Sequence, residues 1–311
     1  MVLKQRKEKG MKFKILSGSQ LREAYRDGQN IAALLREQSG GQNSAEIIET
    51  AYDLQAGSYV RSQRDPKRCA FRETYAAELE KVFAEIGMPS SVLEAGVGEA
   101  TTLSYVLKAI GKSMPAMGVD ISWSRVNWAR RWLGEQGIEG VKLALADLEH
   151  LPLSDNAIDV VYTSHSIEPN RGREREILAE LYRVTGRYLV LLEPAYELAG
   201  EKARARMDEH GYCRDLPGQA EALGMRVVVH RLFPLSANPE NPTALTVIEK
   251  ATDHKPDNLD WHCPVAGGLL VERQGFWYSD QSMLAYPVLG GLPCLRCEKG
   301  IIASQYLDDG L

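Results

Sequence analysis

The sequence predicts an α/β protein with a doubly wound, seven-stranded, mostly parallel sheet, a helical N-terminal cap and a small C-terminal β-rich domain. After Pro89, short apolar runs alternate with helical stretches, which is typical of a parallel sheet covered on both faces. The last two apolar runs follow each other closely around a loop rich in Pro and Asn, which indicates a final antiparallel pair. From Trp261 onward the chain is rich in glycine and turns, and this piece is too short to bury much of its own surface.

The individual elements follow from the spacing of apolar residues. Apolar residues at helical spacing predict helices over 20–37, interrupted at Gly28, and over 44–52, 72–86 and, as an insertion, 199–223. Compact apolar runs predict the seven strands at 91–95, 116–120, 141–146, 158–162, 188–192, 225–230 and 244–249.

These elements divide the chain into four parts. We expect a leader and helical cap over 1–44, the α/β domain over 45–250, a polar linker over 251–260 and the β-rich domain over 261–311. The first ten residues are highly charged without apolar periodicity, so we expect them to be disordered. The β-rich domain should pack against the α/β domain, because it cannot build a sizeable core alone.

Composition narrows the class of protein. The chain is 44% apolar and 25% charged, with a net charge of -5 that disfavours nucleic acid as a partner without excluding it. No apolar stretch is long enough to insert into a membrane or to form a secretory signal, so we expect a cytoplasmic protein. Its 5 cysteines are an odd number, which argues against a disulfide framework. A homodimer is compatible with the sequence.

A glycine-rich turn follows the first predicted strand. Gly96 and Gly98 stand before the next helix, where missing side chains let a ligand approach the backbone. The dinucleotide fingerprint would need a further glycine at Thr101. Glu94 would repel a phosphate at this turn but suits a cationic ammonium group. The turn therefore predicts a ligand without a pyrophosphate.

Two more acidic residues end the next two predicted strands. Asp120 ends the second strand, where an acid reaches the ribose hydroxyls of a nucleotide-like ligand. Asp147 ends the third strand, where a side-chain acceptor could take the exocyclic amine of adenine. Together with Glu94, these residues predict a nucleoside that carries an amino acid and no phosphates.

Over about residues 45–250 these motifs resemble the class I S-adenosylmethionine-dependent methyltransferases, Rossmann-like enzymes of the methyltransferase type 11-like kind. One departure is Ala100, where many members have a third glycine. The resemblance implies S-adenosyl-L-methionine as cofactor, with its methionine part against the glycine turn, its ribose at Asp120 and its adenine at Asp147. The residues expected at the cofactor are Tyr52, Tyr59, Glu94, Gly96, Gly98, Asp120, Ile121, Asp147, Leu148 and Ser164.

The sulfonium of this cofactor is an activated electrophile, so a hydroxyl acceptor mainly needs positioning and the removal of a proton. His165 and Glu168 follow the fourth strand and are our catalytic candidates, together with His210 in the predicted insertion. His165 equally fits a residue that caps the next helix or lines the methionine pocket. Glu193 after the fifth strand is a further candidate, and Glu193 and His210 both fit solvated or structural residues as well.

A basic segment, residues 61–72, follows Tyr52 and Tyr59 and could reach over the substrate opening. The arginines of 171–175 could lie beside it. We expect it to bind a phosphate or carboxylate of the substrate, although a charge run also fits a solvated face. Trp123 lies close enough to the second strand to stack on adenine. The substrate candidates in the basic segment are Arg61, Arg64, Arg68 and Arg72.

Several acceptor classes lack their motifs. No Asn/Asp-Pro-Pro-Tyr/Phe run, typical of enzymes that methylate base amines, follows the fourth strand, and no cysteine nucleophile directly follows the fourth or fifth. We therefore expect methyl transfer to a hydroxyl or amine of a small polar acceptor, such as a sugar or a surface-glycan precursor. The alternatives are a tRNA or ribosomal-RNA methyltransferase and a non-catalytic scaffold that binds the cofactor.

The C-terminal residues 261–311 resemble the Trm112-like domain, which in other proteins carries four zinc cysteines and acts as a methyltransferase activator. Only Cys263 remains at those positions, because Ala266, Ser279 and Ser282 stand where the other three cysteines would be. We therefore expect no metal. The pair Cys294 and Cys297 lies outside the register of that family, and a site rebuilt from this pair with Cys263 and His262 is the alternative.

Overall fold

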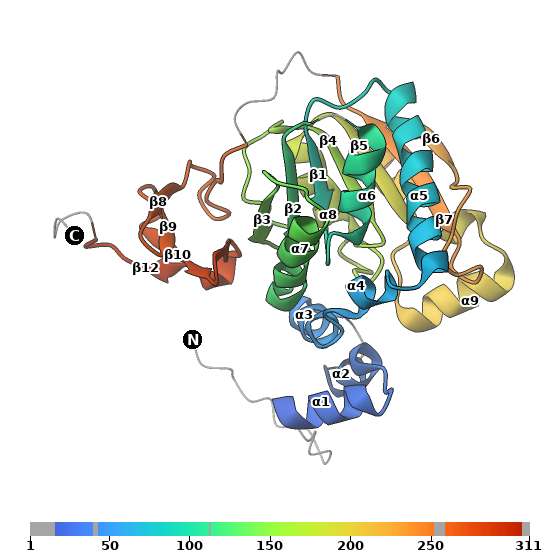
Figure 1. Cartoon of the computed structure of the whole chain (residues 1–311), viewed down its shortest axis with the longest axis horizontal. Coiled ribbons are helices and arrows are strands. Elements are labelled where there is room, and N and C mark those ends of the chain that lie inside the picture. Colours follow the sequence, from blue (N-terminus) through green and yellow to red (C-terminus); the bar gives the residue numbers. More distant parts are fainter. Residues whose placement is uncertain (1–15, 40–42, 112, 252–258, 307–311) are drawn as a thin grey trace.

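A computed structural model of the chain describes residues 16–39, 43–111, 113–251 and 259–306 (Figure 1). The expected leader and most of the expected linker lie outside these residues. A seven-stranded sheet forms the centre, with helices on both faces and a small β structure beside one edge (Figure 1). No helix in the described part of the chain is long and apolar enough to cross a bilayer.

The central sheet has the strand order β3-β2-β1-β4-β5-β7-β6. Strands β1 to β5 run parallel, and β7 is antiparallel to both β5 and β6. This confirms the predicted doubly wound, mostly parallel sheet and its final antiparallel pair. The strands are β1 Val92–Ala95, β2 Ala116–Asp120, β3 Lys142–Leu145, β4 Ile158–Ser164, β5 Thr185–Pro194, β6 Arg226–Leu232 and β7 Thr243–Glu249.

The order of the strands determines where a ligand can bind. From β1 the chain builds the sheet outward through β2 and β3, and from β4 it builds the sheet in the other direction. The connections that follow β1 and β4 therefore leave toward opposite faces, and a crevice opens between them at the carboxyl ends of the strands. Each of the polar residues predicted at the ends of strands one to four is brought to this edge.

Alternating side chains of the strands fill two separate cores. In β1, Val92 belongs to one core and Leu93 to the other, and Val160 and Val161 of β4 divide in the same way. Figure 1 shows α5, α6 and α7 over one face, and α8 and α10 cover the other. These covering helices are α5 Pro66–Glu85, α6 Thr101–Ile110, α7 Trp123–Glu135, α8 Glu174–Val184 and α10 Leu216–Ala222.

The N-terminal cap consists of short helices below the carboxyl edge of the sheet (Figure 1). The predicted helix over 20–37 is two helices, because the chain turns at Gly28 with φ 78°. Ala24, Ile31 and Ala51 form a small core that joins three of the cap helices. The remaining helices are α1 Gly18–Arg26, α2 Ile31–Ser39, α3 Ala45–Leu54, α4 Ser58–Ser62, the 3-10 turn Tyr196–Leu198 and α9 Glu201–His210.

The helix predicted over 72–86 begins earlier than expected. Asp65 caps the first turn by accepting from the backbone N–H of Lys67, and Pro66 occupies the first helical position. Half of the basic segment is therefore the first turns of α5 rather than a separate connection. Arg68 and Arg72 therefore lie on α5, whereas Arg61 lies in α4 and Arg64 in the turn between the two helices.

The C-terminal module, residues 261–306, carries β8 Val271–Arg273, β9 Phe276–Ser279, β10 Leu284–Leu289, β11 Leu292–Pro293, the 3-10 turn Cys297–Lys299 and β12 Ile301–Ile302. It lies against β3, the edge strand of the central sheet. Cys294 pairs with Leu145 in a parallel bridge, and the N–H of Leu295 donates to the carbonyl of Leu145 at 2.9 Å. The module thereby covers backbone groups that an edge strand would otherwise expose.

Candidate functional site

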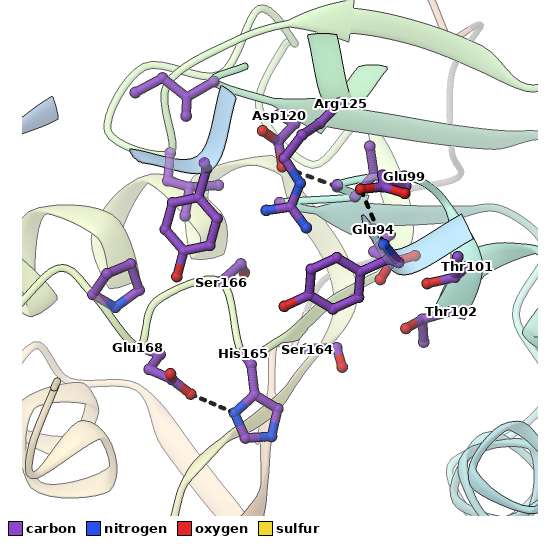
Figure 2. A pocket seen from close by; sticks show the side chains of 18 of the residues that line it. Glu94, Glu99, Thr101, Thr102, Asp120, Arg125, Ser164, His165, Ser166 and Glu168 are labelled. Carbon is purple, nitrogen blue, oxygen red and sulfur yellow. Dashed lines mark hydrogen bonds and ion pairs between the residues drawn. The ribbon is translucent and has the colours of Figure 1, made fainter. Parts of the chain in front are cut away.

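A cavity of about 260 Å³ lies at the carboxyl edge of the sheet, between the strand ends and the cap (Figure 2). The structure brings together in this one cavity all ten residues that the resemblance implied for the cofactor. They are Tyr52, Tyr59, Glu94, Gly96, Gly98, Asp120, Ile121, Asp147, Leu148 and Ser164. They come from α3, α4 and the ends of β1, β2, β3 and β4, which are far apart in the sequence.

The glycine turn after β1 forms one wall of the cavity. Gly96 and Gly98 have φ of 80° and 54°, in the left-handed region that side chains disfavour. A Cβ at Gly96 would overlap the side chain of Ser166, and one at Gly98 would lie 2.6 Å from Nη2 of Arg125. Both positions therefore require glycine for conformation, and Gly96 requires it for space as well.

Asp120 is fixed at the end of β2 by backbone donors. Its two carboxylate oxygens accept from the N–H of Gly98 and of Ser122, each at 2.9 Å. The residue is 6% exposed, and it lines the cavity. Because each carboxylate oxygen has a second acceptor position, the group can still take hydrogen bonds from two vicinal hydroxyls.

Glu94 is a buried carboxyl group with one side-chain partner. The hydroxyl of Tyr162 donates to its Oε2 at 3.1 Å, and only 2% of the residue is exposed. Burial raises the pKa of Glu94 to about 8, although the hydrogen bond from Tyr162 and the charge of Arg72 oppose this effect. An ammonium group in the cavity would oppose it further, so this side chain fits the amino group of an amino-acid ligand.

Asp147 and Arg173 form the wall beneath β3. The guanidinium of Arg173 lies 3.5 Å from Oδ1 of Asp147 and also pairs with Glu149. Oδ1 of Asp147 additionally accepts from the N–H of Glu149 at 3.1 Å. The sequence had placed Arg173 beside the basic segment, whereas its contacts here hold the acidic residue in place.

Arg125 lines the cavity, and the sequence analysis missed it. Its guanidinium lies 5.0 Å from the ring centroids of both Tyr52 and Tyr59, between the two rings. Its Nε is buried and has no hydrogen-bond partner among the described residues. Figure 2 shows the side chain beside Asp120, with its guanidinium in the cavity. The sequence could have predicted this position. Side chains in the first turn of a helix lean toward its N-terminus, and the helix of Arg125 begins at the end of β2.

Two carboxylates tie the cap to the cofactor loops, and we call them the cap latches. Glu99, in the glycine turn, accepts from the N–H of Gly57 at 2.9 Å and of Val60 at 2.7 Å, at the start of α4. Asp53, in α3, accepts from the hydroxyl of Ser122 at 2.7 Å and the N–H of Ser124 at 3.0 Å, at the start of α7. Each latch satisfies N–H groups that a helix N-terminus leaves unpaired. The cap that carries Tyr52 and Tyr59 is thereby held over the cavity.

His165 and Glu168 also line the cavity and are paired with each other (Figure 2). Nδ1 of His165 lies 2.6 Å from Oε2 of Glu168, and Nε2 lies 2.9 Å from the hydroxyl of Thr243. Burial lowers the pKa of His165, but the hydrogen bond and charge of Glu168 outweigh it, so the pKa is raised. Burial raises the pKa of Glu168, but the hydrogen bond and charge of His165, with hydrogen bonds from Tyr212 and Asn241, outweigh it and lower the pKa. Both ring nitrogens therefore have hydrogen-bond partners, and Nε2 can bind an acceptor only in exchange for Thr243.

Two other acid–base candidates have contacts that are structural. His210 does not line the cavity, and its Nδ1 lies 2.9 Å from the carbonyl of Arg206 at the end of α9. Glu193 is 1% exposed, and its carboxylate accepts from three successive N–H groups, those of residues 166–168, at 3.0 to 3.1 Å. Glu193 therefore shapes the loop that follows β4.

The four arginines of the basic segment separate in space. Arg72 lines the cavity, and Arg68 lines a second groove beside it. Arg61 stacks over Trp128 at 6.0 Å, and Arg64 lines neither space. Trp123, which we expected to stack on adenine, instead donates from Nε1 to the carbonyl of Leu289 in the C-terminal module at 3.1 Å, and it does not line the cavity.

The four positions that the resemblance assigned to zinc cysteines come together in the C-terminal module. Sγ of Cys263 lies 3.3 Å from the hydroxyl of Ser282 and 3.4 Å from the N–H nitrogen of Ala266. The N–H of Ser282 donates to the hydroxyl of Ser279 at 3.2 Å. Within the described ranges, no three His, Cys, Asp or Glu side chains are placed to share a metal ion.

Comparison with known proteins agrees with the site. Residues 92–187 match the family model of a methyltransferase domain. An uncharacterized 37.1 kDa protein in transposon TN4556 of Streptomyces fradiae is 33% identical over 34% of this chain and 31% of its own length. The arsenite methyltransferase of Halobacterium salinarum is 25% identical over 33% of this chain and 26% of its own length. The chain thus spans less than a third of the length of these curated relatives.

Among solved structures, magnesium protoporphyrin IX methyltransferase from Synechocystis PCC 6803, with bound S-adenosylhomocysteine, matches with a TM-score of 0.51 and 15% identity. The match covers 67% of this chain and 100% of that chain. The family match supports a methyltransferase domain over residues 92–187, and the solved structure shares the predicted fold.

Proposed function

We propose that this chain is an S-adenosylmethionine-dependent methyltransferase that acts on a hydroxyl or amine of a small polar acceptor. One observation carries the proposal: ten residues chosen from five separate segments of the sequence line a single cavity at the switch point of the sheet. The preferred acceptor class is a sugar or a surface-glycan precursor. The cavity volume of about 260 Å³ and the net charge of -5 both favour a small molecule over an RNA.

In this proposal the residues of the cavity divide the cofactor among them. Glu94 takes the amino group, the turn at Gly96 and Gly98 lies along the methionine part, Asp120 takes the ribose hydroxyls and Asp147 the adenine amine. The bound cofactor supplies a methyl group on a positively charged sulfur, which needs no further activation. The cap latches keep Tyr52 and Tyr59 over the cavity and so exclude water from it.

The protein's remaining task is to orient the acceptor and to receive its proton. His165, positioned by Glu168, is the candidate base, and its Nε2 becomes available when the contact to Thr243 is exchanged for one to the acceptor. The hydroxyls of Tyr75 and Ser164, 3.0 Å apart, lie on the same wall and can hydrogen-bond an incoming polar group. An amine acceptor that is already neutral would need only the positioning.

We further propose that residues 261–311 are a Trm112-like module built into the chain. The clustering of Cys263, Ala266, Ser279 and Ser282 supports the resemblance, since a domain with that ancestry should keep the four positions together. The pairing of this module with β3 supports a role in stabilising the methyltransferase domain.

The first test is binding. Calorimetry with the purified full chain should detect S-adenosylmethionine and S-adenosylhomocysteine. Gly98→Val, which would place a side chain against Arg125, and Asp120→Ala should each weaken both ligands at least about tenfold, the loss expected for one or two hydrogen bonds to a charged group. An unaltered wild type that binds neither ligand would end the proposal.

The second test is transfer of a labelled methyl group. Sugar nucleotides, cell-surface glycan extracts and tRNA should be offered in parallel to the wild type. We expect label in one of the sugar fractions. Label in tRNA alone would make an RNA the substrate, and binding without label in any fraction would favour a scaffold that uses the cofactor without turnover.

A further inference from the structure

A second groove adjoins the cavity and opens to solvent, and we call it the outer groove. Five residues line both spaces, so the two are continuous: Tyr59, Phe71, Arg72, Ala237 and Asn238. The outer groove runs between α4, the start of α5 and the loop that joins β6 to β7. Arg72 is the one charged residue among these five.

Arg72 is a half-buried cation where the two spaces meet, and its charge also acts on the carboxyl group of Glu94. Its Nη1 donates to the hydroxyl of Thr102 at 3.1 Å, and its guanidinium lies 5.8 Å from the ring centroid of Tyr75. Among the described residues, no acidic side chain forms an ion pair with Arg72 or with Arg68, whereas Arg173 on the adenine side has two. A guanidinium has five N–H donors in a planar fork, so most of those on Arg72 are available to a ligand.

The other walls of the outer groove are polar and uncharged. Gln55, Ser58, Ser62, Gln63 and Asn238 contribute amide and hydroxyl groups, which donate to and accept from hydroxyls. The rings of Tyr59 and Phe71 supply flat apolar surface of the kind that packs against the C–H face of a sugar. This combination suits a molecule rich in hydroxyls that also carries negative charge.

From these features we infer that the acceptor is an acidic, hydroxyl-rich small molecule, a sugar phosphate or sugar acid, whose anionic group is held in the outer groove by Arg72 with Arg68 beside it. The inference rests on the proposed function and narrows its substrate class. Arg72 stands where the groove meets the cavity, so it fixes one end of the acceptor while the other end faces the cofactor. Arg68, exposed one helical turn earlier, reaches the same anion from the solvent side.

The experiment is a calorimetric titration of the full chain saturated with S-adenosylhomocysteine. The probes are inorganic phosphate, glucose 6-phosphate, glucuronate and glucose. We expect glucose 6-phosphate or glucuronate to bind at least about tenfold more tightly than glucose, because only the anionic sugars can accept charged hydrogen bonds from the guanidinium of Arg72. The two anionic sugars separate a phosphate site from a carboxylate site, and inorganic phosphate measures the anion alone.

Three variants locate the effect. Arg72→Met, which keeps the length but removes the charge, should abolish the preference for the anionic sugars, and Arg68→Met should reduce it several-fold. Arg64→Met is the matched control, since Arg64 belongs to the same segment but lines neither space, and it should bind like the wild type. The affinity for S-adenosylhomocysteine should stay within about threefold in all of them, which also shows that they fold.

Two results would overturn the inference. One is equal or absent binding of the charged and neutral sugars by a wild type that binds S-adenosylhomocysteine normally, which leaves the proposed function intact. The other is an equal loss of S-adenosylhomocysteine and anion binding in Arg72→Met, which would make Arg72 part of the cofactor site. A wild type that does not bind S-adenosylhomocysteine would contradict the proposed function itself.

Discussion

At the scale of single residues, the protonation of Glu94 makes the stability of the folded state depend on pH. The pKa of this carboxyl group is about 8, above the ordinary value of 4.5, so the folded protein holds a proton that the unfolded chain releases. This group therefore makes the folded state less stable as pH rises from about 5 to 8. Glu94→Gln, which cannot ionise, should remove that loss. Urea unfolding across this range measures it, with Glu85→Gln, exposed on α5, as the matched control.

The same protonation should govern cofactor binding. An ammonium group beside Glu94 favours the charged carboxylate, so affinity for S-adenosylmethionine should rise with pH toward 8 and binding should release a proton. Calorimetry in two buffers of different ionisation enthalpy detects that proton. Proton release that persists in Glu94→Gln would assign it to another group.

His165 gives a second prediction at this scale. If it is the base, its neutral form is active, and its raised pKa places the rising limb of turnover above pH 6.5. His165→Gln should lower turnover by about a hundredfold or more with cofactor affinity little changed. Glu168→Gln should move the limb to lower pH, because the carboxylate that raises the pKa is gone. Equal losses of turnover and of affinity in His165→Gln would identify a residue of the cofactor pocket.

At the scale of elements, the latch at Glu99 joins the cap to the glycine turn. Glu99→Gln keeps the size of the side chain but removes the charge that several backbone N–H groups share, and its amide nitrogen would face one of those donors. We expect faster amide exchange over 57–63 and S-adenosylmethionine binding weakened about tenfold, as for a lost charged hydrogen bond. Exchange at β4 should be unchanged, and altered exchange throughout the sheet would mean general destabilisation instead.

The elements also show what the sequence could predict. Alternating apolar runs predicted the sheet, because each strand is buried on both faces, and acids at the strand ends predicted the cavity, because parallel strands end at one edge. The early start of α5 was missed although Asp65 and Pro66 mark it, since the charges beyond them suggested a connection. Glu99 could not be recognised, because its partners lie in α4 and only the folded cap brings them together.

At the scale of the whole molecule, Arg296 joins the C-terminal module to the cap. It is 3% exposed and pairs with Glu49 of α3, the helix that carries Tyr52 and Asp53. Arg296→Gln should lower the free energy of unfolding by about 2 kcal/mol, as expected for a partly exposed pair with one buried partner. It should also weaken cofactor binding several-fold. Thermal unfolding and calorimetry measure both effects.

Lys299→Gln is the control. Lys299 is exposed at the end of the 3-10 turn that Arg296 precedes. It should leave the melting temperature and the cofactor affinity unchanged. An Arg296→Gln protein that is destabilised but binds the cofactor normally would confine this ion pair to stability and separate the module from the cavity.

The pairing of Cys294 with Leu145 has a consequence for stoichiometry. A separate partner that pairs with an edge strand must be present above its dissociation constant, whereas a segment of the same chain meets that edge at an effective concentration on the order of millimolar. An interface too weak to hold two free proteins together therefore suffices here. Dilution cannot separate the two parts, and each α/β domain carries one module at every level of expression.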